Sequence, residues 1–437
     1  MSISTIIKRK FIKKYFHIIE MLIPSKKIRR GLKNVSYLTI GQFISLIISF
    51  FGLIYIARLL GPSDYGIYVT VSAFVGMFVV ITFEGINKVV LREGAKDLSK
   101  MRGFIEKTTA IKNIFTFSAI IVCIISSFFT PYSIQVKLYI VLFSFSLVYN
   151  SFNDFFMNVY KATEKMQYNS IIYISNRVLF VSLSIAFLYM GFGLLALFII
   201  ALISQFLTLL INFRLTKRFL VFKFWNKIKW DKYIIKPALV FSVLAFAYLL
   251  TGKIDLVMIS LLGSSKDVGL YGVAHQMMIT GLTMRGLLST AFFPIFVKTY
   301  HKNAVKWSNL LKYAIIMGLC FLAIATIISL FSEQIITLML GEKYLESGTL
   351  LGVLAFYLAL AFFSFPFSNT LQATHNEIYL LKICWVAPFL NIGLNYLFFK
   401  TFGLIGIAYS TLVVGCVSLI LYITMTWKAL KVQNKLK

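Results

Sequence analysis

Long runs of apolar residues, separated by short polar segments, divide this chain into regular units. Each run extends over about 20 residues, the length that an α-helix needs to cross the hydrocarbon core of a bilayer. The runs do not alternate polar and apolar residues, as the strands of a membrane barrel would. The pattern predicts an all-α polytopic membrane protein with about twelve transmembrane helices, at roughly 35–57, 66–88, 108–129, 134–158, 168–190, 193–213, 237–262, 270–297, 312–332, 348–371, 378–399 and 403–427.

The placement of the basic residues predicts how these helices are oriented. The chain has 44 Lys and Arg against 15 Asp and Glu, a net charge of +29. Of these 44 residues, 36 lie in the termini or at every second loop, whereas the alternate loops hold five and the spans three. This asymmetry follows the positive-inside rule and places both termini in the cytoplasm. The basic excess is therefore expected to face anionic membrane lipids and not nucleic acid.

The longest predicted cytoplasmic loop separates two equal sets of helices. Because each set has an even number of spans, the two sets run parallel, with a central cavity between them. We expect a basic amphipathic cytoplasmic segment at 1–33, a first six-helix lobe at 34–213, a cytoplasmic linker at 214–236, a second six-helix lobe at 237–427 and a cytoplasmic tail at 428–437.

Three short motifs recur in the same order in the two predicted lobes. Duplicated membrane halves are typical of transporters, which have their substrate path between the repeats. The first motif, Leu-Leu-Gly followed by Asp-x-Gly-x-Tyr, combines helix-ending and capping residues. We expect it to form a tight outer hairpin in each lobe and not to contact substrate. The copies lie at 59–68 and 261–271, at 158–163 and 369–374, and at 192–195 and 402–405.

Basic side chains inside the predicted spans are candidates for substrate binding. An ionised group at the bilayer centre costs at least about 2.5–3.5 kcal/mol, so it usually faces a partner or a wet cavity. Arg177, Lys253 and Arg285 lie within spans, and Arg58 stands at the outer end of the first span. A cavity lined by several cations attracts an anionic group, phosphate above all. These four residues are the predicted cationic cavity.

The acidic residues within the spans are candidates for gating or for ion pairs. Asp255 lies in the middle of the seventh span, and we expect it beside Arg177 or Arg285. Glu84 and Arg285 lie at similar depths in equivalent helices, which suggests that they meet across the axis when the cytoplasmic side closes. His275, in the outer half of the eighth span, is a candidate for proton coupling.

The chain resembles polysaccharide flippases of the Wzx type, in the multidrug/oligosaccharidyl-lipid/polysaccharide exporter superfamily. The resemblance rests on segments from both halves and covers roughly residues 34–427. These segments are Ala-Arg-Leu-Leu-Gly-Pro at 57–62, Asp-Tyr-Gly-Ile-Tyr at 64–68, Leu-Arg-Glu-Gly-Ala at 91–95, Lys-Ile-Asp-Leu-Val-Met-Ile at 253–259, Val-Gly-Leu-Tyr at 268–271 and Phe-Pro at 293–294.

The resemblance implies a MATE-like fold that works by alternating access in a bacterial plasma membrane. The implied substrate is a polyprenyl-diphosphate-linked oligosaccharide repeat unit, moved from the cytoplasmic to the outer leaflet for O-antigen, capsule or exopolysaccharide. Arg58, Arg177 and Arg285 would receive the diphosphate or acidic sugars. A polysaccharide polymerase or its chain-length machinery is an implied protein partner, and no cofactor is implied.

Two other function classes remain open at this point. A drug or cation antiporter of the same superfamily would be expected to place acidic groups at the floor of its cavity. A membrane polysaccharide polymerase or glycosyltransferase would be expected to have large outer loops with catalytic residues. The predicted outer loops are short, and the sequence contains no nucleotide, metal or nucleophile motif. We therefore predict that the chain is not an enzyme and binds no metal.

Overall fold

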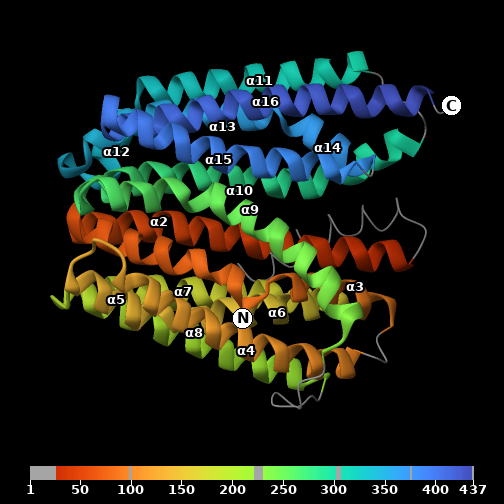
Figure 1. Ribbon diagram of the computed structural model, residues 1–437, viewed down its shortest axis with the longest axis horizontal. Helices are drawn as coiled ribbons and strands as arrows, with labels where there is room; N and C mark the ends of the chain where they lie inside the picture. The colour runs from red at the N-terminus through yellow and green to blue at the C-terminus, as the bar shows by residue number, and fades with distance from the viewer. Residues whose placement is uncertain (1–25, 98–100, 221–229, 302–306, 375, 436–437) are drawn as a thin grey trace, which may run out of the picture.

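The computed structural model describes residues 26–97, 101–220, 230–301, 307–374 and 376–435, and all regular structure in these ranges is helical. The longer helices run along a common axis, and the turns between them gather at the two ends (Figure 1). In chain order the elements are α2 (Lys26–Met77), η1 (Phe78–Thr82), α3 (Gly85–Lys96), α4 (Met101–Phe128), α5 (Ile134–Ser144), α6 (Ser146–Ala162), α7 (Gln167–Tyr189), α8 (Leu194–Lys217), α9 (Lys232–Leu262), α10 (Ser265–His301), α11 (Trp307–Leu330), α12 (Ser332–Leu340), η3 (Glu342–Tyr344), α13 (Glu346–Phe363), α14 (Phe365–Ala373), α15 (Glu377–Phe402) and α16 (Leu404–Lys435).

The described residues contain ten helices that are long and apolar enough to cross a membrane. This confirms the predicted multi-pass membrane protein. One of the ten, Ser36–Thr82, holds two predicted spans, because α2 turns at Gly61, whose backbone is not helical (φ 76°, ψ 168°). The helix that covers the predicted span 270–297, α10, is not among the ten, so the total of twelve stays a prediction.

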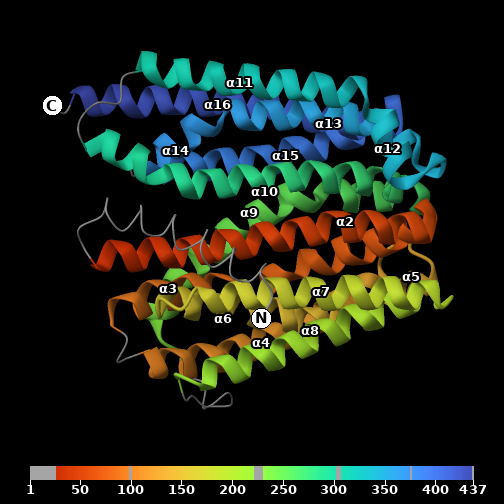
Figure 2. The ribbon, with the colours of Figure 1, turned by 180° about the vertical axis from the view of Figure 1, so that it is seen from behind.

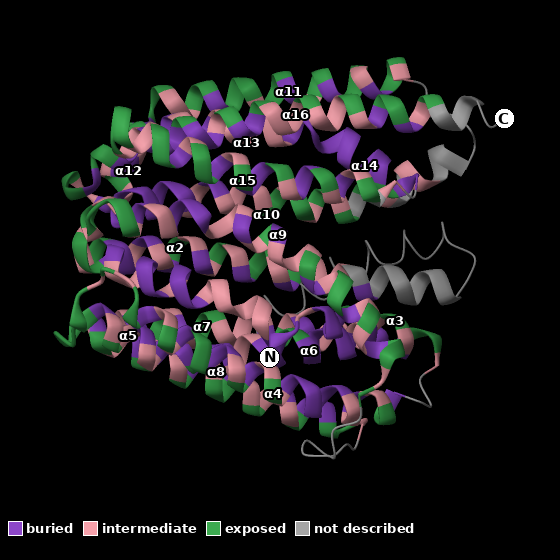
Figure 3. Cartoon of the chain, in the orientation of Figure 1, coloured by how far each residue is buried: buried purple, intermediate pink, exposed green. Residues whose placement is uncertain are grey.

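Large apolar side chains are exposed on the outward faces of the helices. Figure 3 shows exposed residues along α8 and α11, for example. Phe117, Phe206 and Phe389 each expose more than half of their surface, as expected of side chains that face lipid tails.

The helices form two groups that lie side by side in both views (Figures 1 and 2). The first group consists of α2 to α8, and the second of α9 to α16. Helix α9 runs obliquely: it packs against α15 of its own group and also against α2 and α3 of the first group. The division into the two predicted lobes stays a prediction; in the structure both α9 and α10 of the second group pack against α2 of the first.

All four predicted segment boundaries fall inside helices, namely α2, α8, α9 and α16. Helix α2 already begins at Lys26, within the predicted segment 1–33, whose first 25 residues lie outside the described part. Helices α8 and α9 extend into the predicted linker 214–236, and residues 221–229 lie outside the described part. Helix α16 continues through the predicted tail as far as Lys435.

The repeated motifs occupy equivalent turns in the two groups. The first motif forms the Gly61 kink in α2 and the tight turn between α9 and α10, which confirms the predicted hairpins. The second motif ends α6 and α14, and the third precedes α8 and α16. We call the end with the first-motif turns the outer end, following the charge pattern, and the opposite end the inner end.

Candidate functional site

At the outer end, the two copies of the first motif pack against each other. Gly66 of α2 faces the start of α10, where an added Cβ would lie 1.7 Å from the carbonyl oxygen of Ser265. Gly269 of α10 faces α2 in the same way, with an added Cβ 1.9 Å from the carbonyl oxygen of Pro62. Only glycine permits so close a crossing, since any side chain would collide with backbone. The duplicated glycines therefore allow the two helix groups to meet.

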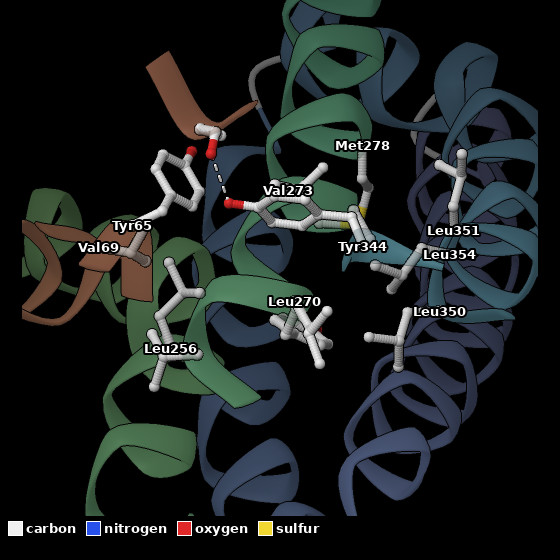
Figure 4. Close-up of a cluster of buried hydrophobic side chains, with 14 of the residues drawn as sticks. Tyr65, Val69, Leu256, Leu270, Val273, Met278, Tyr344, Leu350, Leu351 and Leu354 are labelled. Carbon is white, nitrogen blue, oxygen red and sulfur yellow. Dashed lines mark hydrogen bonds between the residues drawn. The ribbon is translucent and has the colours of Figure 1, made fainter. Parts of the chain in front are cut away.

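A buried apolar cluster fills the outer half of the same interface. Figure 4 shows Tyr65 and Val69 of α2 beside residues of the second group such as Leu256. Tyr344, which is fully buried in η3, donates a hydrogen bond of 2.8 Å to the carbonyl oxygen of Ala57 in α2. The outer end is thus closed by a dry core.

At the inner end, the first group meets the second through α9. The backbone N–H of Gly85 donates to Ser242 Oγ over 2.9 Å, and an added Cβ on Gly85 would lie 1.8 Å from the carbonyl oxygen of Ala238. Lys107 and Asp231 form an ion pair of 3.4 Å. Farther toward the outer end, α9 packs against α2, and Ser260 of α9 is hydrogen-bonded to Tyr132 of the first group over 2.6 Å.

A cavity of about 480 Å³, in the inner half of the molecule, is lined by residues of α9 and of the first-group helices α3, α6 and α7. Its volume is within the usual range for small-molecule sites. The first group contributes all of the charged and amide side chains together with Met157 and Tyr173, and α9 contributes aromatic and apolar residues only; the full lining is Glu84, Asn87, Lys88, Asp154, Met157, Asn158, Lys161, Tyr173, Phe241, Leu244, Ala245 and Tyr248.

A break in the second predicted span positions Glu84 at this cavity. Helix η1 ends at Phe83, a non-glycine residue in the left-handed conformation (φ 61°, ψ 54°), and α3 then begins at Gly85. Lys112 of α4 is fully buried beside the break; its Nζ donates to the carbonyl oxygen of Thr82 over 3.2 Å and lies 3.8 Å from Glu84 Oε1. Glu84 therefore has its cationic partner within its own group, and among the described residues no ion pair joins it to Arg285.

Lys112 was missed at the sequence level. It lies five residues into the predicted span 108–129, so close to the basic inner loop that it counts as one of the loop lysines. The local sequence offered one signal: Lys112 follows the small residues Thr108, Thr109 and Ala110. The structure shows that these three residues are buried.

Asp255 is buried and is held by neutral groups alone. Its carboxylate accepts hydrogen bonds from Asn391 (2.6 Å), Asn395 (2.8 Å), Tyr271 (2.9 Å) and Thr411 (3.0 Å). The expected pairing with Arg177 or Arg285 is therefore wrong for this structure. A buried carboxylate without a cationic partner is a chemical candidate for taking up a proton or a small cation, because either would neutralise its charge.

Two further features adjoin Asp255. A second cavity, of about 200 Å³, is lined by Asp255, Asn391, Thr411 and Tyr248 among others. His275 is buried one helical turn from Tyr271, and the two rings lie 5.9 Å apart. The proton-coupling role of His275 stays a prediction, but its place beside the Asp255 network is now defined.

The four predicted cationic residues do not form one cluster. Arg285 donates to Ser368 Oγ over 3.1 Å, and its Nε is buried without a partner. Lys253 extends across the interface to α2, where an added Cβ on Gly76 would lie 2.8 Å from its Cε.

The remaining two are exposed, Arg177 in α7 and Arg58 at the outer end of the first limb of α2. Arg177 lies one turn outward from Tyr173, which lines the larger cavity. None of the four forms an ion pair with a described carboxylate.

Comparison with known proteins identifies the family. Residues 31–300 match the family model described as polysaccharide biosynthesis protein. The capsular polysaccharide biosynthesis protein CapF of Staphylococcus aureus is 22% identical over 403 residues, which are 89% of this chain and 98% of CapF.

Two solved membrane proteins share the fold. An inward-facing multidrug resistance MATE family transporter of the MOP superfamily has a TM-score of 0.73 at 16% identity, covering 89% of this chain and 96% of the other. The lipid II flippase MurJ, in an inward closed conformation, has a TM-score of 0.74 at 14% identity, covering 90% and 87%. The chain therefore belongs to the polysaccharide biosynthesis protein family and has a MATE-like fold.

Proposed function

We propose that this protein is a flippase that moves a polyprenyl-diphosphate-linked oligosaccharide repeat unit from the cytoplasmic to the outer leaflet of a bacterial plasma membrane. The observation that supports this best is the difference between the two ends of the interface. The outer end is closed by the Gly66–Gly269 crossing and the Tyr344–Ala57 bond, whereas the inner half contains a polar cavity. A transporter that alternates its access needs such a state to load substrate from the cytoplasm.

The deep cations favour an anionic substrate over a cationic one. Arg177, Lys253 and Arg285 lie within the membrane-spanning helices without a carboxylate partner among the described residues. A diphosphate would compensate their charge. A cationic drug would meet Glu84 and Asp255 instead, but Glu84 has Lys112 beside it and Asp255 is enclosed by hydrogen bonds. The antiporter is therefore the second candidate, and a polymerase or glycosyltransferase the third.

Gene deletion in a capsulated or O-antigen-forming host tests the proposal. We expect surface polysaccharide to disappear and lipid-linked repeat units to accumulate in the cytoplasmic leaflet. Complementation with Lys253→Met or Arg285→Met should restore transport poorly. Lys400→Met is the matched control, because Lys400 lies over the Tyr396 ring at the outer end. Normal surface polysaccharide in the deletion strain, combined with new drug sensitivity, would identify the antiporter instead.

The gating hypothesis for Glu84 and Arg285 can be tested in the same strain. If the two side chains meet when the inner end closes, Glu84→Arg and Arg285→Glu should each abolish transport, and the double reversal should restore part of it. Absence of rescue would leave Glu84 with its observed partner, Lys112, as a residue of the first group alone.

A further inference from the structure

We propose that the 480 Å³ cavity binds the sugar end of the lipid-linked substrate, with hydroxyl and amide groups of the sugar rings donating to Asn87 and Asn158. This inference rests on the proposed flippase function. It assigns the sugar end of the substrate to this cavity and the diphosphate to a different site.

Two amide oxygens at this cavity have no hydrogen-bond donor among the described residues. Asn87 and Asn158 are 2% and 7% exposed, and the Oδ1 atom of each is buried without a partner. Their orientation is fixed by the other half of each amide: Asn87 Nδ2 donates to Glu84 Oε2 over 2.7 Å, and Asn158 Nδ2 donates to the carbonyl oxygen of Asp154 over 2.8 Å. Buried acceptors without donors are uncommon and destabilising, so a pair at one cavity indicates a ligand that supplies donors.

The charges of the cavity disfavour the diphosphate as that ligand. The lining holds two lysines, Lys88 and Lys161, and two carboxylates, Glu84 and Asp154, so its own formal charges sum to zero, and the one further cation beside it, Lys112, already pairs with Glu84. A diphosphate also carries no N–H and, when ionised, no O–H to donate to an amide oxygen. Arg177, one turn outward from the cavity, and Lys253 at the interface are the cations left free for it.

The chemistry of a sugar matches both sides of the cavity. Hydroxyl groups donate and accept, so one ring can satisfy the asparagine oxygens, the carboxylates and the lysines together. On the other side, Phe241 and Tyr248 of α9 offer ring surfaces to the C–H faces of a sugar. Neutral sugars and acetamido sugars combine these features most fully, since an acetamido group adds an N–H donor.

Binding of defined lipids to the purified full chain in nanodiscs tests this assignment. The probes are undecaprenyl diphosphate alone, the same lipid carrying one hexose, and the same lipid carrying one N-acetylhexosamine. We expect at least one sugar-bearing lipid to bind about tenfold more tightly than the bare lipid. Asn87→Leu and Asn158→Leu should remove most of this preference and leave binding of the bare lipid unchanged.

Control variants separate a lost contact from a damaged fold. Asn169→Leu is the matched control, because Asn169 is also buried with an unpartnered Oδ1 but lines neither of the two cavities. Tyr248→Ala serves if the leucine variants do not fold: Tyr248 is 56% exposed, and its loss should also reduce the sugar preference.

The outcomes distinguish the two proposals. Equal binding of bare and sugar-bearing lipids by the unmodified protein overturns the sugar site and leaves the flippase intact. Loss of bare-lipid binding in the leucine variants overturns it too, because the cavity would then hold the diphosphate. Failure of the unmodified protein to bind any of the three lipids overturns the proposed function itself.

Discussion

At the outer end, the two helix groups meet along an apolar core, whereas at the inner end they enclose a polar cavity. The outer contact uses duplicated residues, Gly66 and Gly269, and the described residues there form hydrogen bonds between the groups from Tyr344 to Ala57, within hydrophobic side chains, and between Tyr132 and Ser260. The inner contact uses Gly85 and Ser242, which have no duplicated counterpart among the repeated motifs.

The difference assigns separate tasks to the two ends. Close packing of backbone on backbone has few alternative arrangements, so under the proposed function we expect the outer end to be either fully closed or open. The inner end holds its charges in hydrogen-bonded networks that solvent or substrate can reach through the cavity. Under the proposed function, the duplicated residues would close the outer end, and the polar residues of the inner half, which have no counterpart in the repeated motifs, would recognise the substrate. The predictions below test this division, from the largest expected effect to the smallest.

The largest effect is expected from Lys112→Met, which removes the buried cation of the inner half. Lys112 is fully buried between Glu84 and the carbonyl oxygen of Thr82, so its loss leaves a carboxylate without compensation. We expect a loss of stability of about 3 kcal/mol, measured as thermal unfolding in detergent. The double variant with Glu84→Gln should recover much of it. Lys107→Met, in the same helix but with a half-exposed ion pair, should cost less than about 1 kcal/mol.

The next effect is expected from Gly66→Ala, which blocks the outer crossing. The added methyl would lie 1.7 Å from the carbonyl oxygen of Ser265, so α2 and α10 cannot approach as they do here. We expect transport to fall about 100-fold, equivalent to about 2.7 kcal/mol. In a cysteine-free background, a Val257→Cys probe should become reactive to an impermeant maleimide from outside.

A matched glycine separates the crossing from helix propensity. Gly252 of α9 has open space around an added Cβ, so Gly252→Ala should leave both transport and labelling near normal. If Gly66→Ala behaves like Gly252→Ala, the outer end does not depend on the close crossing of the repeated motifs.

The difference between the two ends also explains how far the sequence could be interpreted. Runs of apolar residues predicted the helices, because each must cover one bilayer, and the repeats predicted the outer turns at Gly61 and Gly263. Both signals are local, because each can be identified from consecutive residues. The position of Arg285 and Lys253 deep within their spans was also predicted locally, from where each residue lies in its apolar run.

The partners of the buried charges could not be predicted in this way. The donors to Asp255 come from α10, α15 and α16, between 16 and 156 residues away in the chain. The left-handed Phe83, which breaks the second span, has no glycine to mark it. Charge alone suggested that Asp255 would pair with an arginine, but neutral amides and hydroxyls satisfy a buried carboxylate with smaller desolvation costs than a second ion.

A moderate effect is expected from Tyr344→Phe, which removes the hydrogen bond to Ala57 but keeps the ring. The buried carbonyl then loses a donor, which costs about 1–2 kcal/mol in the outer-closed state alone. Labelling of Val257→Cys from outside should therefore rise about tenfold, while a probe at Ala245 in the inner cavity stays unchanged. Tyr396→Phe, at a ring that is 48% exposed, is the control and should change neither probe. Equal changes at both probes would show that Tyr344 stabilises the fold as a whole.

The smallest effect is expected from Ser242→Ala at the inner end. Ser242 Oγ accepts a hydrogen bond from the Gly85 N–H, which lies at the start of α3 beside the polar cavity, so water can replace the lost acceptor. We expect labelling of Ala245→Cys in inside-out vesicles to rise about threefold, with no change at Val257. Ser182→Ala, an exposed serine bonded within its own helix, should have no effect. An effect larger than that of Tyr344→Phe would reverse the comparison, because it would make the inner contact through α9 the tighter of the two closures.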